Sequence, residues 1–254
     1  MIDWAELTLF LYVLARMSGF IVFIPILGRR NIPGFFRSGM ALVFAVFVFS
    51  VAEGTAAAPS GLIDLALHMV LEMSLGFLAG MIVSFFFYIP QLAGSVVDTQ
   101  MGMTMNQIYD AGSQANMSVT GTLLNALMML LFFAANGHHT LIRIFMTSEQ
   151  IVPYGQAVLT APAASAMLEI FIECTVLGVK LCMPVLAAEL IAQIGMGILM
   201  KVIPQINVFA INVELKVIIG LGLLFLLIAP FSEYLLRAES AMLDYISRIL
   251  AYSG

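Results

Sequence analysis

Long apolar runs separated by short polar breaks dominate this 254-residue chain and limit what it can fold into. A run of about 20 apolar residues can cross the hydrocarbon core of a bilayer as a helix. With 62% hydrophobic and 10% charged residues, the composition excludes an ordinary soluble domain. We therefore predict an all-α, polytopic, membrane-associated protein. Its helical runs are expected at about Leu7 to Leu27, Ser38 to Val51, Leu62 to Ile89, Val119 to Ala135, Ala166 to Met200 and Ile206 to Phe231.

The breaks between these runs predict where the helices end. The third run is expected to end before Pro90, because proline interrupts the hydrogen bonding of a helix. Glu149 to Pro162 is expected to form a loop. The last two runs are joined by a tight turn that begins at Lys201, so they predict a helical hairpin. Arginines in the first loop place that loop and Lys201 on the cytoplasmic side by the positive-inside rule.

Several charged residues interrupt the apolar runs. A charge at bilayer depth costs a few kcal/mol unless protein or water surrounds it. We therefore expect these helices to pack mainly against protein, above all against partner subunits. The charges in question are Arg16 in the first run and Glu169, Glu173, Lys180 and Glu189 in the fifth.

The stretch from Gln91 to Ser118 is too polar for a lipid-facing helix. It is rich in Gln, Asn, Gly and Met, with the acids Asp98 and Asp110 and no Lys or Arg. Such backbone exists at membrane depth only inside protein or beside a water-filled cavity. The residues alone leave two possibilities, an aqueous loop or part of a pore. Met101, Met103 and Met105 alternate within it, and adaptable methionine suits either a seal or ordinary core packing.

One helical face carries a candidate metal site. Asp64, His68 and Glu72 follow i, i+4, i+8 spacing and therefore share a face. The pair His138 and His139 would be needed to complete a site, but no sequence feature joins the two regions. We predict a polar stripe, with no metal and no cofactor. The sequence also lacks HExxH, GxSxG and P-loop motifs, so we predict no enzyme activity.

Other function classes are excluded by charge and motif content. The net charge of −5 and the scattered cations argue against nucleic-acid binding. Cys174 and Cys182 lack CxxC spacing and are predicted to be packing residues.

One function class stays open as an alternative reading of the chain, a secondary transporter or small-solute channel with a broken-helix binding site. Such a protein is expected to show internal repeats, and none is convincing here.

Small residues recur at helical spacing. Gly76, Gly80 and Ser84 repeat every four residues, which lets another helix approach closely. Gly195, Gly197 and Gly220 provide similar faces in the final hairpin. These faces are predicted to pack helices, either within this chain or against a partner.

Several short motifs occur along the chain in a characteristic order. They are ARMSG at 15–19, NIP at 31–33, QMG at 100–102, NGHH at 136–139 and GMGILMKVIPQINVF at 195–209. Together they resemble the FliR family of flagellar biosynthetic proteins over essentially the whole chain. Two positions depart from that pattern: Lys201 replaces an expected arginine, and Ala111 replaces a common proline.

The resemblance implies a fold and a function. It implies a single export-gate domain over 1–254, with a FliP-like part at about 1–162 and a FliQ-like hairpin and tail at about 163–254. It also implies a core subunit of the flagellar type III protein export gate in the bacterial inner membrane, within the flagellar basal body. FliP and FliQ would be its partners, FlhB and FlhA its neighbours, and unfolded flagellar proteins its cargo. The turn carrying Lys201, Pro204, Gln205 and Asn207 would face the cytoplasmic entrance.

The resemblance further implies that a loop plugs the channel at rest. In this sequence the matching segment runs from about Asn106 to Thr122, with Gln100 to Met105 as its support. Gly112 and Gly121 would act as hinges. The predicted plug and gate residues are Met101, Met103, Met105, Asn106, Gln107, Ile108, Tyr109, Asp110, Gly112, Gln114, Asn116, Met117 and Gly121.

Overall fold

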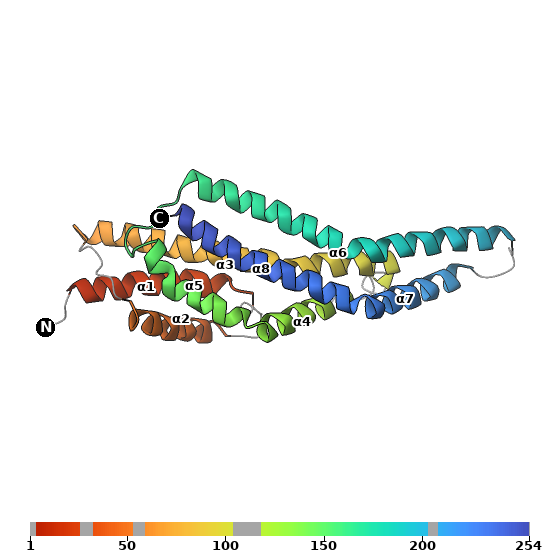
Figure 1. The fold of residues 1–254 in the computed structure, drawn as a ribbon, viewed down its shortest axis with the longest axis horizontal. Helices are drawn as coiled ribbons and strands as arrows, with labels where there is room; N and C mark the ends of the chain where they lie inside the picture. The colour runs from red at the N-terminus through yellow and green to blue at the C-terminus, as the bar shows by residue number, and fades with distance from the viewer. Residues whose placement is uncertain (1–3, 26–32, 53–58, 104–117, 203–207, 254) are drawn as a thin grey trace. The chain divides into compact units, whose positions relative to one another are not determined.

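The described part of the chain consists of α-helices and the connections between them (Figure 1). A computed structural model describes residues 4–25, 33–52, 59–103, 118–202 and 208–253, without the side chains of 208–213. These residues contain no strand, which confirms the all-α prediction. The helices are α1 (Trp4–Phe23), α2 (Gly34–Phe49), α3 (Leu62–Met101), α4 (Val119–Ala134), α5 (Gly137–Ile151), α6 (Ala161–Val202), α7 (Val208–Leu226) and α8 (Ile228–Tyr252).

Several of these helices have the length and composition of membrane spans. Among the described residues, α1, α3 and α6 are each long and apolar enough to cross a bilayer. The number rises to as many as five if α4 with α5, and α7 with α8, each count as one broken span. At 16 residues, α2 is apolar but shorter. The fold therefore supports the membrane-associated class predicted from composition.

Helix α3 continues through Pro90, so the prediction that it ends before this proline was wrong. The helix extends to Met101, and Pro90 lies buried inside it. Proline removes one backbone donor, but neighbouring groups in a packed helix can satisfy the carbonyl that this leaves. As a result, the segment from Gln91 to Met101, which is the first part of the polar stretch, is helical.

The C-terminal region also differs from the prediction. The last apolar run was expected to continue to Phe231, but α7 ends at Leu226 and a further helix, α8, follows. The buried side chains of α8 recur every three or four residues, which is the pattern of an amphipathic helix. These side chains are Phe231, Leu235, Ala238, Met242, Ile246 and Ile249.

The connection between α5 and α6 is shorter than predicted. The expected loop ran from Glu149 to Pro162, but α5 continues to Ile151 and α6 already begins at Ala161. Val152 and Tyr154, between the two helices, are buried. This connection is therefore part of the packed structure.

The chain divides into two compact units. Unit 1 comprises Met1–Phe86, Asn136–Ile172 and Glu239–Gly254, and unit 2 comprises Phe87–Ala135 and Glu173–Ala238. Both are discontinuous in sequence, and α3, α6 and α8 contribute residues to each. The boundary expected near residue 162, between a FliP-like and a FliQ-like part, stays a prediction.

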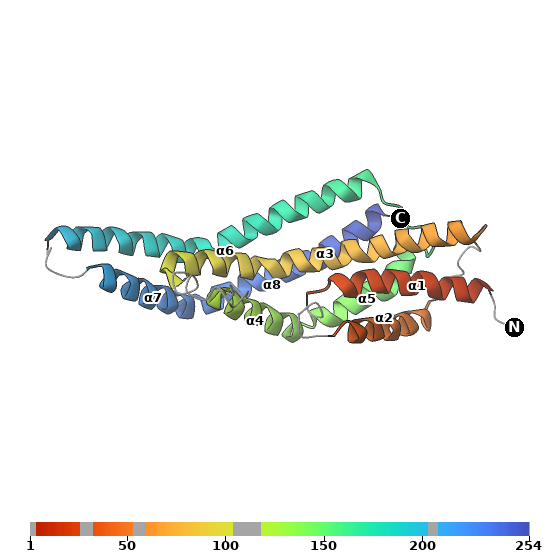
Figure 2. The same ribbon diagram turned by 180° about the vertical axis from the view of Figure 1, so that it is seen from behind.

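In unit 1, α1 packs closely against α3 and also contacts α2 (Figure 2). A Cβ atom added to Gly76 of α3 would collide with the backbone oxygen of Arg16. Gly80 lies similarly close to Phe20, with 2.8 Å from its added Cβ to the Phe20 oxygen. The Ser84 hydroxyl donates a 2.5 Å hydrogen bond to the Phe23 carbonyl. The small residues predicted to pack helices therefore lie where the backbones of α1 and α3 touch.

In unit 2, the end of α3 contacts α4, α6 and α7. The rings of Phe87 and Phe132 meet edge to face at 5.7 Å, which joins α3 to α4. A Cβ on Gly178 of α6 would lie 2.8 Å from the Leu92 side chain. Within the same unit, the Tyr234 hydroxyl of α8 donates a 3.0 Å hydrogen bond to the Leu177 carbonyl of α6.

Candidate functional site

Most of the predicted plug lies outside the described residues, but the segment before it and its last five residues are described. Positions 104–117 are not described, so nothing structural follows for Met105, Asn106, Gln107, Ile108, Tyr109, Asp110, Gly112, Gln114, Asn116 or Met117. The preceding flank is the end of α3 with Met101 and Met103. The last residues of the predicted plug, Ser118 to Thr122 with Gly121, are described and lie at the start of α4. The roles of all these residues in a plug stay predictions.

A buried carboxylate joins the two flanks. Asp98, in the last turn of α3, is 1% exposed and accepts a 2.7 Å hydrogen bond from the Ser118 hydroxyl. The Thr120 amide points at both carboxylate oxygens of Asp98, at 3.2 and 3.3 Å. The Ser118 hydroxyl oxygen in turn accepts from the Gly121 amide at 2.8 Å and so caps α4. A negative charge at the N-terminus of a helix is favourable, because the first amides there lack helical acceptors.

Two glycines bring the same backbones into direct contact. A Cβ on Gly94 of α3 would collide with the backbone of Gly121 in α4. A Cβ on Gly121 would in turn lie 3.2 Å from the Gln91 oxygen. We call Gly94, Asp98, Ser118, Thr120 and Gly121 the α3–α4 clamp. The clamp holds the last residues of the predicted plug, Ser118 to Gly121, against the end of α3 that precedes it.

The other described gate residues have different surroundings. Met101 is fully buried, and a Cβ on Gly220 of α7 would collide with its side chain. Met103 is partly buried just after α3. Gly121 is buried in the first turn of α4, where the structure shows a close helix contact. Its use as a hinge stays a prediction.

Unit 1 contains a buried cluster around Arg16, which we call the Arg16 cluster. The Arg16 and Glu72 side chains are both 0% exposed, and Arg16 Nε donates to Glu72 Oε2 at 2.6 Å. The remaining nitrogens of Arg16 donate to the Ser148 hydroxyl and the Val152 carbonyl, each at 3.0 Å. The other oxygen of Glu72 accepts from the Gly155 amide at 2.8 Å. This cluster therefore connects α1, α3, α5 and the connection that follows α5.

An aromatic ring completes the Arg16 cluster. The guanidinium carbon of Arg16 lies 4.3 Å from the centre of the Tyr154 ring, a cation–π arrangement. Burial raises the pKa of the Tyr154 phenol above its usual value, so the ring stays neutral at physiological pH. Arg16 therefore faces protein, as predicted, but the protein is its own chain, and packing of these helices against partner subunits stays a prediction. The sequence did not identify its partner Glu72, which lies 56 residues away.

The structure separates the residues of the candidate metal site. Asp64 and His68 form a partly exposed pair at 3.3 Å, whereas Glu72 belongs to the Arg16 cluster. Among the described residues, no group of three or more His, Cys, Asp or Glu side chains is arranged to hold a metal. The helical spacing therefore predicted correctly that Asp64 and His68 lie close together, but Glu72 pairs with Arg16 instead.

Helix α6 presents charged and apolar side chains on its surface. Glu169 and Lys180 are exposed, whereas Glu189 is fully buried. Neither carboxylate oxygen of Glu189 has a hydrogen-bond partner among the described residues. Large apolar side chains are exposed along the same helix, namely Leu168, Phe171, Ile172, Val176, Leu190, Ile191, Ile194 and Ile198.

The hairpin residues are only partly described. Lys201 is exposed in the last turn of α6, and Pro204, Gln205 and Asn207 lie outside the described residues. A Cβ on Gly195 or Gly197 would meet no described atom within 4 Å. The role of these glycines in packing stays a prediction.

Comparison with known proteins places the chain in a family. Residues 7–242 match the family described as bacterial export proteins, family 1. The chain is 29% identical to the flagellar biosynthetic protein FliR of Escherichia coli K12, over 96% of this chain and 94% of that protein. It is 28% identical to the FliR protein of Bacillus subtilis 168, over 96% and 95% respectively. It is also 24% identical to the Yop proteins translocation protein T of Yersinia pestis, over 94% and 92%. These matches confirm the FliR resemblance, and the chain belongs to family 1 of the bacterial export proteins.

Proposed function

We propose that this chain is a core subunit of the flagellar type III protein export gate. Family membership and the names of the FliR and Yop translocation relatives support a component of a type III export apparatus. In this proposal the subunit assembles with FliP and FliQ in the bacterial inner membrane, close to FlhB and FlhA. The assembly forms a channel for unfolded flagellar proteins, and this chain catalyses no reaction.

The α3–α4 clamp carries the proposal of a resting plug. It joins Asp98 to Ser118 through a buried 2.7 Å hydrogen bond, while the intervening stretch contains no Lys or Arg. A segment whose two ends are held together can change conformation without moving its supporting helices. Its polar residues favour hydration, and its single acid, Asp110, leaves little charge to desolvate in a narrow pore.

The surface of α6 supports assembly with partner subunits. Exposed apolar side chains and the exposed charges Glu169 and Lys180 share this helix. Lipid suits the apolar residues but disfavours the charges, whereas a protein partner can accommodate both. We further propose that 1–162 is the FliP-like part and 163–254 the FliQ-like part. The turn with Lys201, Pro204, Gln205 and Asn207 then faces the cytoplasmic entrance.

Deleting Ile108 to Met117 tests the plug. Cells expressing the assembled complex with this deletion should become leaky to small ions, measured by dye or ion flux across the inner membrane. A matched variant replaces the same residues by an equally long Gly/Ser segment. It tests whether the side chains of this segment close the channel or whether its length is enough. Unchanged permeability in a complex that still assembles would refute the resting plug.

The solute-channel alternative predicts a different result. A lone chain in vesicles would then transport one class of small solute without partner subunits. Co-purification of a stable hetero-oligomer, with no solute transport by the lone chain, would support the export gate.

A further inference from the structure

The carboxyl group of Glu189 is buried in unit 2 without a hydrogen-bond donor. The residue is 0% exposed, and neither Oε1 nor Oε2 accepts a hydrogen bond from any group in the described part of the chain. Buried polar groups in folded proteins normally have partners. A lone buried carboxylate is so unfavourable that the group becomes neutral instead of staying charged.

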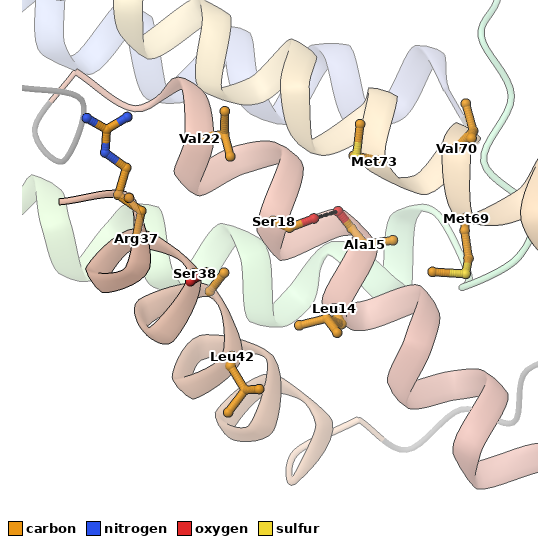
Figure 3. Close-up of a pocket in the computed structure, with 12 residues that line it drawn as sticks. Leu14, Ala15, Ser18, Val22, Arg37, Ser38, Leu42, Met69, Val70 and Met73 are labelled. Carbon is orange, nitrogen blue, oxygen red and sulfur yellow. Dashed lines mark hydrogen bonds between the residues drawn. The ribbon is translucent and has the colours of Figure 1, made fainter.

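Three other groups show how polar side chains are normally satisfied in this chain. Glu72 is held by an ion pair, and Asp98 accepts hydrogen bonds in the α3–α4 clamp. Ser18 lines an apolar groove of about 690 Å³ among α1, α2 and α3, and it donates its hydroxyl to the Ala15 carbonyl at 2.8 Å (Figure 3). Glu189 differs from these groups, because both of its oxygens lack a partner among the described residues.

Glu189 lies on the face of α6 that packs inside unit 2. Leu181, Val185 and Glu189 follow i, i+4, i+8 spacing, and all three are at most 2% exposed. The same face begins at Gly178, where an added Cβ would lie 2.8 Å from the Leu92 side chain of α3. The carboxyl group is therefore enclosed by this chain itself, and no partner subunit is needed to bury it.

The charged side chain that acts on Glu189 comes from the other helix of the hairpin. Lys216 of α7 is partly buried, and its ammonium group attracts the Glu189 carboxylate. Within the described ranges, however, the two side chains form no ion pair at 4 Å or less. Attraction without direct contact or hydrogen bonds offsets only part of the cost of burying a carboxylate.

A metal ion does not fit this site. Ca²⁺ and Mg²⁺ take about six or more oxygen ligands, and Zn²⁺ takes about four ligands in all. Across the described ranges, no group of three or more His, Cys, Asp or Glu side chains is placed to hold a metal. A proton, in contrast, needs a single carboxylate oxygen.

We propose that Glu189 is a proton-binding site, whose carboxyl group holds a proton in the folded chain. Lys216 becomes its counter-charge when the proton leaves. Bound proton removes the buried charge and leaves one O–H donor to satisfy. After proton loss, the flexible four-carbon stem of Lys216 allows its ammonium group to approach the new carboxylate. Proton exchange at Glu189 therefore changes the contact between α6 and α7. This inference does not depend on the proposed export function.

A hydrophobic carbodiimide tests for the bound proton. Dicyclohexylcarbodiimide takes up the carboxyl proton on one nitrogen, while the carboxyl oxygen bonds to its central carbon. A shift of the acyl group to nitrogen then gives a stable N-acylurea that keeps every atom of both reactants. The full-length chain in lipid vesicles at about pH 7 is labelled, and mass spectrometry of its peptides locates the adduct. We expect at least about tenfold more adduct at Glu189 than at Glu214, an exposed acid of the same hairpin.

Two variants distinguish a proton from an ion pair. Glu189→Gln has the shape of the neutral carboxyl group, so it should abolish labelling there and keep Tm within about 2 °C of the wild type. Lys216→Met removes the attraction, so labelling of Glu189 should stay equal or rise. Labelling that appears only in folded Lys216→Met would show that the wild type holds an ionised pair, and would overturn the proposal. Circular dichroism establishes that each variant is folded.

Infrared spectroscopy tests the same proton without requiring access for the reagent. The difference spectrum between wild type and Glu189→Gln at about pH 7 should contain the carbonyl stretch of a protonated carboxyl group. That band supports the proposal even where the reagent fails to reach the buried site. Carboxylate bands in its place would show that Glu189 is ionised and would refute proton binding.

Discussion

Glu72→Ala should be among the most destabilising single substitutions in this protein. It removes the 2.6 Å ion pair with Arg16 and the 2.8 Å acceptor of the Gly155 amide. Removing one partner of a fully buried pair costs about 3–5 kcal/mol, and an unsatisfied buried amide costs about 1–3 kcal/mol. Because the two effects overlap, we expect a loss of about 4 kcal/mol in the free energy of unfolding. For a chain of this size that lowers Tm by about 10 °C.

Thermal unfolding of the purified chain in detergent, followed by circular dichroism, measures this loss. Glu72→Gln keeps an acceptor for the Gly155 amide but still leaves Arg16 without a counter-charge, so it should lose about 3 kcal/mol, a smaller amount than the alanine variant. The double variant Arg16→Met with Glu72→Leu removes both charges and should be more stable than Glu72→Ala alone. Glu169→Ala, at an exposed site on α6, should change stability by less than about 0.5 kcal/mol. A loss below about 1 kcal/mol for Glu72→Ala would refute a stabilising role for the cluster.

Three further predictions concern other parts of the fold. Gly94→Ala forces a Cβ into the backbone of Gly121 and should cost about 1–3 kcal/mol, measured by thermal unfolding. Asp98→Ala should cost about 2 kcal/mol, because it leaves buried donors without an acceptor, and should also raise ion leakage through the assembled complex. An unchanged free energy of unfolding in either variant would contradict the contact between α3 and α4. Replacing Asp64 and His68 by Asn should leave export unchanged in a motility assay, whereas loss of export together with bound metal would support a metal enzyme.

Composition and apolar run length predicted the helical class and most helix positions. The run from Val119 to Ala135, for example, corresponds to α4 at Val119–Ala134. The prediction failed at Pro90, because proline disfavours a helix locally, whereas tertiary packing lets α3 continue through it. It also failed at α8, because a search for uninterrupted apolar runs overlooks a helix whose apolar positions are separated by charges. The recurrence of Leu235, Met242 and Ile249 at seven-residue spacing was a usable signal.

The candidate sites depended on contacts that spacing cannot reveal. Asp98 was recognised only as an acid in a polar stretch, because its partners Ser118 and Thr120 follow about 20 residues later. Glu72 shares a helix face with His68, but its stronger partner is Arg16 on another helix. A sequence shows which residues need a partner in an apolar environment. The folded chain decides which partner each one finds.

The Arg16 cluster has a consequence for biosynthesis. Arg16 lies in α1, yet its partners follow 56, 132 and 136 residues later in the chain. Until Glu72 and then Ser148 and Val152 emerge from the ribosome, a lone guanidinium in lipid is unfavourable. We therefore expect α1 to stay where water or protein surrounds Arg16 until these partners have been made. On this reasoning, α1 reaches its final packing only after Val152 has been made, so the Arg16 cluster links the fate of α1 to a much later part of the chain.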